Sequence, residues 1–497
     1  MTPPPRSATD PSTLPWHLSQ DGPAPAAADP EVPLAGPAAR AVTARQRVPA
    51  PAPVPGSGSG PGAGTDVLPR GEDGAVAPAQ APDAAPAHDG PGAAVPLRRN
   101  RDFGLLWGGA GLSLLAGRAT AVAYPLTVLW VTGSPGDAGL VGTALLLPQL
   151  LVQLPGGALV DRWDRRRIML GAGLGQALIA GAVAALLLSG HVWLWALLAA
   201  AFAEGALGVL HQLAERAAVP AVVPAEQLPA ALTGNEARTR GAAIAGQPLG
   251  SGLVALGASF PYLAALVGQL ASTVLLFGVH GKLQTVPDGG RTGPRPDLLA
   301  EVREGLAWMW RQHFLRAVMA AVAVSNVLFQ GLNLAVMTGI QARHGSQFEI
   351  GLVLSLSGAG GLVGALSGGW WTRRSSLRAL VLGGLLAWTA LMVPVAYLHE
   401  PLALGALFAA SGYVGGVFNV AGGVFLVRVA PDRMRGRANS LAMLVGSGAM
   451  AAGPVAAGFA LEAFGPTRTV LGLSAAMGLT ALAALLSPAL RRNPLDA

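Results

Sequence analysis

The sequence predicts an all-α integral membrane protein with twelve membrane-spanning helices, arranged as two pseudo-symmetric halves of six. Of its 497 residues, 52% are hydrophobic and 12% are charged, whereas about 25% of the residues in a soluble domain are charged. Long apolar runs alternate with short segments that carry arginine, and these arginines concentrate in every second segment. This composition argues against a soluble multidomain enzyme. It also argues against a nucleic-acid-binding protein, despite the net charge of +7.

Residues 1–97 differ from the rest of the chain. They contain 21 of the 40 prolines, carry a net charge of −4, and show few aromatic residues and no apolar periodicity. Such a segment cannot bury enough apolar surface to offset its chain entropy, so we expect a disordered cytoplasmic tail. It lacks the apolar run of roughly 7–15 residues that a signal peptide needs. Its role is either that of a docking or regulatory tail or that of a solvated extension.

The remaining residues contain twelve apolar stretches that can cross a bilayer, which takes about 20 residues. The predicted spans are 104–130, 139–160, 168–189, 192–212, 241–260, 262–280, 316–339, 350–370, 378–398, 401–427, 438–459 and 469–490. Glycine is frequent within them, and in lipid small residues let helices approach each other closely.

The cationic residues predict the orientation of these spans. With the N-terminus in the cytoplasm, 25 Lys and Arg residues fall in cytoplasmic segments, and only Arg343 and Arg468 fall on the opposite side. Cytoplasmic loops of membrane proteins carry such an excess. Both termini are therefore expected in the cytoplasm. The Arg-rich, nearly Lys-free composition is typical of a bacterium with a GC-rich genome, so we expect the spans in a bacterial plasma membrane. Arg118 is the one cation within a span.

A linker at 282–315 separates the two predicted halves. In it, Val302, Leu306 and Met309 share one face of a predicted helix, with charged residues on the others. This pattern favours an amphipathic helix on the cytoplasmic membrane surface, although a partner-binding helix would show the same pattern.

The first half, 98–281, and the second half, 316–497, repeat some features. Pro248 and Pro454 lie 206 residues apart, and another proline pair, Pro224 and Pro431, lies 207 apart. Near-constant offsets suggest a duplicated six-helix unit.

The loop after the second predicted span carries the most specific motif. Residues 157–167 read GALVDRWDRRR. This stretch resembles the Gly-x-x-x-Asp-Arg-x-x-Arg-Arg signature of the major facilitator superfamily, with Gly157 and Asp161 in the glycine and aspartate positions. The matching arginines are Arg162, Arg165 and Arg166, followed here by Arg167.

Other segments support the same resemblance, which covers residues 98–490. Pro248, with Gly250 nearby, and Pro454 resemble the Gly-Pro kink motif of drug/proton antiporters, although Gln247 replaces the glycine. The segments RNRDFGLLW, YPLTVLWVTGSP and EVREGLAWMW look like those of macrolide-efflux and siderophore-export proteins. The resemblance implies a twelve-helix secondary transporter that is not an enzyme.

In the superfamily, the matching aspartate faces the N-terminus of span 11, where an anionic group is favourable. Here that span would begin near 437–440. Arg166 or Arg167 could then pair with Glu215. Together with the contact of Asp161, this pair would form a cytoplasmic latch. The alternative is that these arginines are only topological anchors. The second half has no matching acid.

Ionisable residues inside predicted spans are candidates for proton coupling, because charge at membrane depth is costly. Glu204 is the natural proton carrier, and Arg118 could lie near it, since the resemblance implies that spans 1, 4, 7 and 10 line a central cavity. The alternative is a purely structural Arg–Glu pair. His211 lies on the same helix face as Glu204 and Glu215, and we expect it nearer the membrane interface.

Polar side chains inside the second half predict a substrate path. Their spacing is helical, and they cannot comfortably face lipid, although hydrogen bonds between helices would explain them equally well. The candidate cavity residues are Asn326, Gln330, Asn333, Ser411 and Asn419, together with Tyr124 in the first span. A largely apolar cavity favours lipophilic or amphipathic substrates.

Several other functions lack their motifs. The sequence has no phosphate-binding GxxxxGK[ST] loop, no HExxH motif and no cysteine. We therefore expect no ATP use, metal or cofactor, and a proton gradient as the energy source. The predicted function is proton-coupled export of a drug, antibiotic or natural product by a monomer whose partners are its substrate and the lipid bilayer. Alternatives are a siderophore or metabolite exporter and a non-transporting membrane sensor or scaffold.

Overall fold

The computed structural model describes residues 97–281, 283–284, 307, 311–429, 444, 446 and 448–491. The chain divides into two units, Met1–Ala87 and His88–Ala497, and the account below concerns the second alone. The predicted tail up to residue 96 and most of the predicted amphipathic helix, including Val302, Leu306 and Met309, lie outside the described residues. Within them, the secondary structure is helical without strands, as predicted for an all-α protein.

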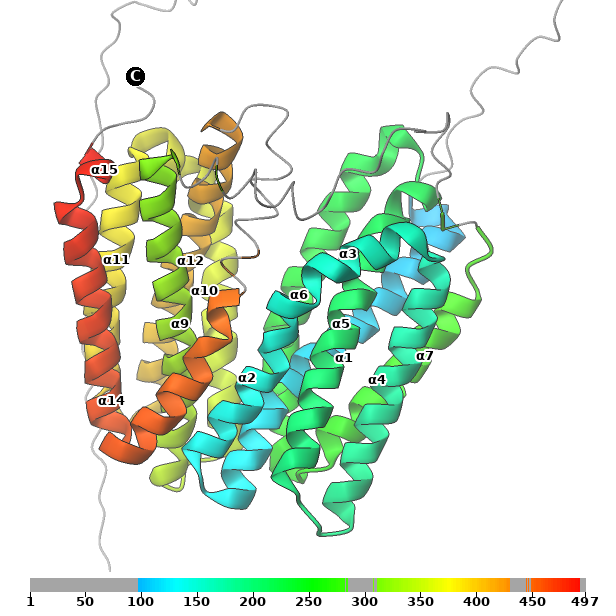
Figure 1. The fold of residues 1–497 in the computed structure, drawn as a ribbon, viewed down its shortest axis with the longest axis horizontal. Coiled ribbons are helices and arrows are strands. Elements are labelled where there is room, and N and C mark those ends of the chain that lie inside the picture. Colours follow the sequence, from blue (N-terminus) through cyan, green and yellow to red (C-terminus); the bar gives the residue numbers. More distant parts are fainter. Residues whose placement is uncertain are drawn as a thin grey trace, which may run out of the picture. The chain divides into compact units, whose positions relative to one another are not determined.

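Seven α-helices form the first half (Figure 1). They are α1 (Arg101–Thr132), α2 (Pro135–Leu151), α3 (Gln153–Arg162), α4 (Arg165–Leu188), α5 (Leu194–Val222), α6 (Leu228–Leu256) and α7 (Phe260–Phe277). Helix α1 contacts α6 and α7, and α5 contacts α2 and α4. Several helices begin at a side-chain cap, for example α4, where Asp164 accepts a hydrogen bond from the Arg167 N–H at 2.9 Å. Such a cap satisfies an amide that would otherwise lack a partner.

The second half is built in the same way. Its described helices are α9 (His313–Ala342), α10 (Gln347–Arg374), α11 (Leu377–Val395), α12 (Pro401–Val429), α14 (Ala452–Leu486) and α15 (Pro488–Arg491). Helix α14 is two helical segments joined at Gly465, whose φ of 76° is not helical and which precedes Pro466. This break separates the eleventh and twelfth predicted spans. The start of the eleventh, including 437–440, lies outside the described residues.

Nine helices of the described residues are long and apolar enough to cross a membrane, and α2 with α3 makes a tenth when counted as one bent span. The prediction of a continuous span at 139–160 is wrong in detail, because α2 and α3 are bent by 51°. Pro155 explains the break, since its ring would clash with the carbonyl four residues earlier. The helix expected at 241–260 begins earlier, at Leu228, and carries polar residues along its first half. The count of twelve stays a prediction.

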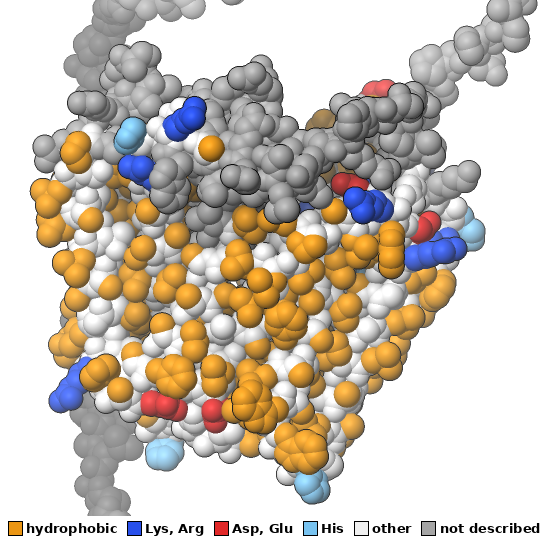
Figure 2. Space-filling view, viewed as in Figure 1, with side chains coloured by type: hydrophobic (Ala, Val, Ile, Leu, Met, Phe, Trp, Pro, Cys, Tyr) orange, Lys and Arg blue, Asp and Glu red, His pale blue; other side chains and the backbone are white. Residues whose placement is uncertain are grey.

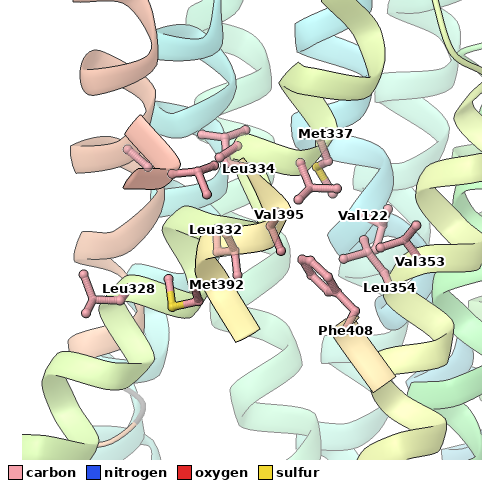
Figure 3. Close-up of a cluster of buried hydrophobic side chains, with 14 of the residues drawn as sticks. Val122, Leu328, Leu332, Leu334, Met337, Val353, Leu354, Met392, Val395 and Phe408 are labelled. Atoms are coloured by element: carbon pink, nitrogen blue, oxygen red, sulfur yellow. The ribbon is translucent and has the colours of Figure 1, made fainter. Parts of the chain in front are cut away.

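The surface and the interior of the two halves are both apolar. Figure 2 shows hydrophobic side chains over the visible face, with charged side chains toward its two borders. Leu178, Trp195 and Leu366 are at least 75% exposed, an arrangement that suits lipid and not water. One buried cluster joins the halves, because Val122 of α1 and Val353 of α10 both belong to it (Figure 3).

The halves meet along two helix pairs, α2 with α14 and α6 with α10. Small residues allow the close approach: a Cβ atom added to Gly458 of α14 would lie 3.1 Å from the Gly136 Cα of α2. The two predicted kink prolines lie at these contacts, Pro454 against α2 and Pro248 against α10. Gly250 instead brings α6 onto α1, where a Cβ atom would overlap the backbone of Ala119.

The two ends of the helices differ in charge. We call the end with Arg162, Arg373 and Arg374 the arginine-rich end, and the end with Ser134 and Glu462 the arginine-poor end. At the arginine-poor end, the Ser134 hydroxyl and the Gly136 N–H donate hydrogen bonds to Glu462 at 2.7 and 3.1 Å. This contact between α2 and α14 ties the halves together at that end.

Candidate functional site

Glu204 lies near the middle of α5 and is 4% exposed. The Thr120 hydroxyl of α1 donates a hydrogen bond of 2.5 Å to its Oε1 atom. In the described part of the chain, its Oε2 atom has no hydrogen-bond partner and its carboxyl group forms no ion pair. The carboxyl group is thus surrounded by neutral groups.

Two buried tyrosines lie beside this carboxyl group. The Tyr124 hydroxyl of α1 is next to Glu204, and the Tyr124 and Tyr262 rings meet edge to face with centroids 5.1 Å apart. Tyr124 was predicted to line the substrate cavity, but the structure buries its side chain completely. Sequence reasoning missed Tyr262, because a tyrosine in the first turn of an apolar helix resembles an ordinary interface residue.

Arg118 does not pair with Glu204, so the expected contact is absent. The reason is geometric: Thr120, which reaches Glu204, follows Arg118 by two positions, about 200° around the helix. Arg118 is exposed, and its side chain begins against α6, where a Cβ atom added to Gly246 would overlap the Arg118 Cβ atom.

Glu215 forms an ion pair with Arg238 of α6, which corrects the predicted pairing with Arg166 or Arg167. The two side chains are 9% and 7% exposed. The Arg238 guanidinium also donates a hydrogen bond of 3.1 Å to the Trp107 carbonyl and lies 5.9 Å from the centre of that ring. His211 is buried one turn away on α5, near Arg238. Its expected position near the membrane interface stays a prediction.

The arginines of the loop motif bind helix ends. Arg165 donates to the Ala217 and Leu283 carbonyls at 2.8 and 3.1 Å, and Arg166 donates to the Phe277 carbonyl at 2.9 Å. The Ala217 and Phe277 carbonyls lie near the C-terminal ends of α5 and α7, where cations are stabilised. The contact with Phe277 explains why Arg166 does not reach Glu215.

The remaining motif residues lie on the surface. Asp161, Arg162 and Arg167 are exposed, and Gly157 has open space around its Cα. The expected partner of Asp161, the start of span 11, lies outside the described residues. The latch therefore stays a prediction.

A cavity of about 210 Å³ lies within the second half. Four of the six predicted cavity residues line it, namely Asn326, Asn333, Ser411 and Asn419. Its aromatic wall includes Phe329, Trp388 and Phe418. Gln330 lies beside it and accepts a hydrogen bond of 3.2 Å from Asn333. Asn326 donates to the Gly446 carbonyl at 3.0 Å. These amides thus both line a cavity and bond to protein groups.

Sequence reasoning missed Trp388 in this cavity. Its indole N–H donates a hydrogen bond of 2.9 Å to the Ser411 carbonyl, and its ring lies edge to face against Phe329, with centroids 5.0 Å apart. A tryptophan in an apolar span gives no signal of the direction in which it points.

The chain matches known proteins over nearly all of this region. The profile of a major facilitator family, described as transmembrane secretion effectors, matches residues 92–496. The chain belongs to the major facilitator superfamily. It is thus a multi-pass membrane transporter and not an enzyme, as the loop motif at 157–167 indicated.

Relatives in two mycobacterial species match this transporter. The multidrug efflux pump Tap of Mycolicibacterium fortuitum is 29% identical over 398 residues, which cover 78% of this chain and 95% of that pump. Tap of Mycobacterium tuberculosis is 26% identical over 385 residues, which cover 74% of this chain and 89% of that pump.

Solved structures agree on the fold of the transporter at low identity. The nucleoside transporter NupG has a TM-score of 0.61 at 13% identity, covering 79% of this chain and 99% of its own. A bacterial homologue of the lysosomal transporter Spinster has a TM-score of 0.62 at 13% identity, covering 80% of this chain and 98% of its own.

Proposed function

We propose that this transporter exports a lipophilic or amphipathic small molecule, such as a drug, antibiotic or natural product, in exchange for protons. The similarity to the Tap multidrug efflux pumps supports export. The observation that carries proton exchange is Glu204, a buried carboxyl group that forms no ion pair in the described part of the chain. A group of this kind can change its protonation when alternating access opens it to either side.

The chemistry of the second-half cavity supports the substrate class. Aromatic side chains form much of its wall, and amides such as Asn333 and Asn419 supply neutral hydrogen-bonding groups. No Asp, Glu, Lys or Arg is among the described residues that line it. Such a cavity suits a mainly apolar molecule with a few polar groups better than a sugar or a phosphate.

The transporter works in the bacterial plasma membrane with both termini in the cytoplasm, and it acts as a monomer without ATP or another cofactor. Its arginine-rich end is then cytoplasmic, which agrees with the excess of cations there. Asp161 completes a cytoplasmic latch with the start of span 11. Asp161→Asn should change transport at normal expression, and unchanged transport would exclude the latch.

The experiment is an efflux assay in cells and in everted membrane vesicles, with ethidium and a panel of antibiotics as probes. Wild type should lower intracellular accumulation of at least one probe, and collapse of the proton gradient should abolish this effect. Glu204→Gln should lose gradient-driven transport by about 100-fold, the scale expected when a proton-transfer group is removed. Glu236→Gln, at an exposed position on α6, is the matched control.

The outcomes separate the alternatives. Export that persists without a proton gradient would contradict proton exchange, and an intact Glu204→Gln variant would contradict the role of that residue. Retention of iron chelators in a deletion strain, with no effect on antibiotics, would favour a siderophore exporter. Phenotypes that depend on residues 1–97 without any flux would favour a sensor or scaffold.

A further inference from the structure

Four buried oxygen atoms without hydrogen-bond partners lie close together in the first half. They are Glu204 Oε2, the Tyr124 and Tyr262 hydroxyls and Thr127 Oγ1, and none of these residues is more than 4% exposed. A buried polar group without a partner costs about 1–3 kcal/mol, so four in one place call for an explanation. The Tyr124 hydroxyl lies beside Glu204 and the Thr127 hydroxyl beside that of Tyr262, but neither pair has the full geometry of a hydrogen bond.

These oxygens form a row that leads away from Glu204. The Tyr124 hydroxyl is next to Glu204, the Tyr124 and Tyr262 rings touch, and the Thr127 hydroxyl is next to that of Tyr262. Thr120, Tyr124 and Thr127 follow one another about one turn apart on α1. Tyr262 is the third residue of α7, so the row reaches the arginine-poor end.

An open pocket lies one turn beyond the row. Trp130 and Gly133, at the end of α1, line it together with Gln341 and His344 from the end of α9. Trp130 follows Thr127 by three positions, which places both on one side of the helix. The pocket thus lies about one helical turn along α1 from Thr127.

We propose that water molecules bound among these oxygens join them into a proton path from the arginine-poor end to Glu204. A buried water needs two to four polar partners, and the row offers pairs of oxygens at each step. The path rests on the proposed role of Glu204 as the proton carrier. It assigns Tyr124, Thr127 and Tyr262 as positioning residues.

The proton balance of this path is simple. A water at the Thr127 and Tyr262 hydroxyls receives a proton from the arginine-poor side and passes one on toward the water between Tyr124 and Glu204. That water delivers a proton to Glu204 Oε2. Each water breaks one O–H bond as it forms another, so the waters and the hydroxyls end unchanged and the carboxylate gains one proton.

The groups that surround Glu204 do not compete for this proton. On α1 and α7 the titratable neighbours are Tyr124 and Tyr262. Helices α2 and α4, which also pack on α5, have no Asp, Glu, Lys, Arg or His within 138–151 and 168–188. The charged residues of α3 lie at its arginine-rich end, and on the side of α6 the Glu215–Arg238 pair lies three turns away along α5, beyond His211.

Radiolytic hydroxyl labelling of the purified full-length protein tests for the water. Radicals form from water itself, so a fully buried side chain is labelled only where water is bound beside it. Tyr124 and Tyr262 should be labelled, while Met392, equally buried within an apolar cluster and intrinsically more reactive, should not. Labelling of the two tyrosines no greater than that of Met392 would overturn the proposal.

Infrared spectroscopy tests the path itself. A protonated carboxyl band that is missing in Glu204→Gln belongs to Glu204, and transfer into D2O shifts it at a rate set by proton access. Tyr262→Phe and Tyr124→Phe should slow this exchange by at least about tenfold, because a positioned proton-transfer group contributes that much or more. Tyr397→Phe, at a site 61% exposed, is the matched control.

The results separate a failure of the proton path from a failure of Glu204 as the proton carrier. If no band depends on Glu204 at any accessible pH, the proposed function of Glu204 fails. If the band is present but exchanges equally fast in both tyrosine variants, only the path fails. Thermal unfolding checks that each variant is folded, and Thr127→Val, which replaces a hydroxyl by a methyl group, provides a third variant with the same expected slowing.

Discussion

Two buried glutamates on α5 have opposite surroundings. Glu215 is held in an ion pair with Arg238 of α6, whereas Glu204 meets the Thr120 hydroxyl and two tyrosines but no cation in the described part of the chain. Removing one partner of a buried ion pair exposes the full desolvation cost of the other. Loss of Glu215 would therefore leave a buried charge unpaired, whereas Glu204 has the neutral surroundings that its proposed role as proton carrier requires.

The largest expected effect is on stability at Glu215. Glu215→Leu leaves the Arg238 guanidinium buried without its carboxylate, which should cost about 3–5 kcal/mol of unfolding free energy. Denaturant unfolding of the purified protein in detergent measures this cost. Adding Arg238→Met should restore most of the stability, because it removes the unpaired charge. If Glu215→Leu alone is as stable as wild type, water satisfies the Arg238 guanidinium without the carboxylate.

The same substitution at Glu204 should behave differently. Glu204→Leu removes one oxygen without a partner and one that accepts a hydrogen bond from Thr120, whose hydroxyl keeps its contacts of 3.2 Å to the Ala116 and Gly117 carbonyls. The unfolding free energy should therefore stay within about 1 kcal/mol of wild type, while gradient-driven transport is lost. A loss of stability equal to that of Glu215→Leu would mean that Glu204 has a structural role after all.

The smallest expected effect is the coupling between the two sites. Glu204 and Glu215 are 11 positions apart, about 16 Å along the helix. The double variant Glu204→Leu with Glu215→Leu should thus show additive losses within about 0.5 kcal/mol. A double-mutant cycle on unfolding free energies measures the deviation. A coupling energy above about 1 kcal/mol would show that the two carboxyl groups belong to one interacting network.

Much of the fold follows from local apolar patterns. Helices such as α4 and α11 lie where continuous apolar runs predict them, since lipid requires the backbone to bond within each segment. The early start of α6 was not predicted, because Arg238 and Arg240 look like loop residues in the sequence. In the structure they form ion pairs with Glu215 and Glu236. The break at Val152 was not predicted either, because Pro155 stands within a long apolar run that favours one continuous span.

The candidate site residues likewise include some that the sequence reveals and some that it does not. Asn326 and Asn333 stand out in the sequence because amides are costly inside an apolar helix, and both line the cavity in the second half. Trp388 and Tyr262 give no such signal, because aromatic residues are common on lipid-facing and buried surfaces alike. Their roles depend on which way a helix is turned.

The apolar runs, the uneven distribution of arginines and the motif at 157–167 are enough to identify a helical membrane protein of the major facilitator superfamily. The partner of each buried charge, in contrast, depends on how the helices pack. Glu204, Glu215 and His211 share one face of α5, so local spacing cannot tell them apart. Their surroundings come from α1, α6 and α7, whose contributing residues lie 23 to 84 positions away in the chain and are brought close only by packing.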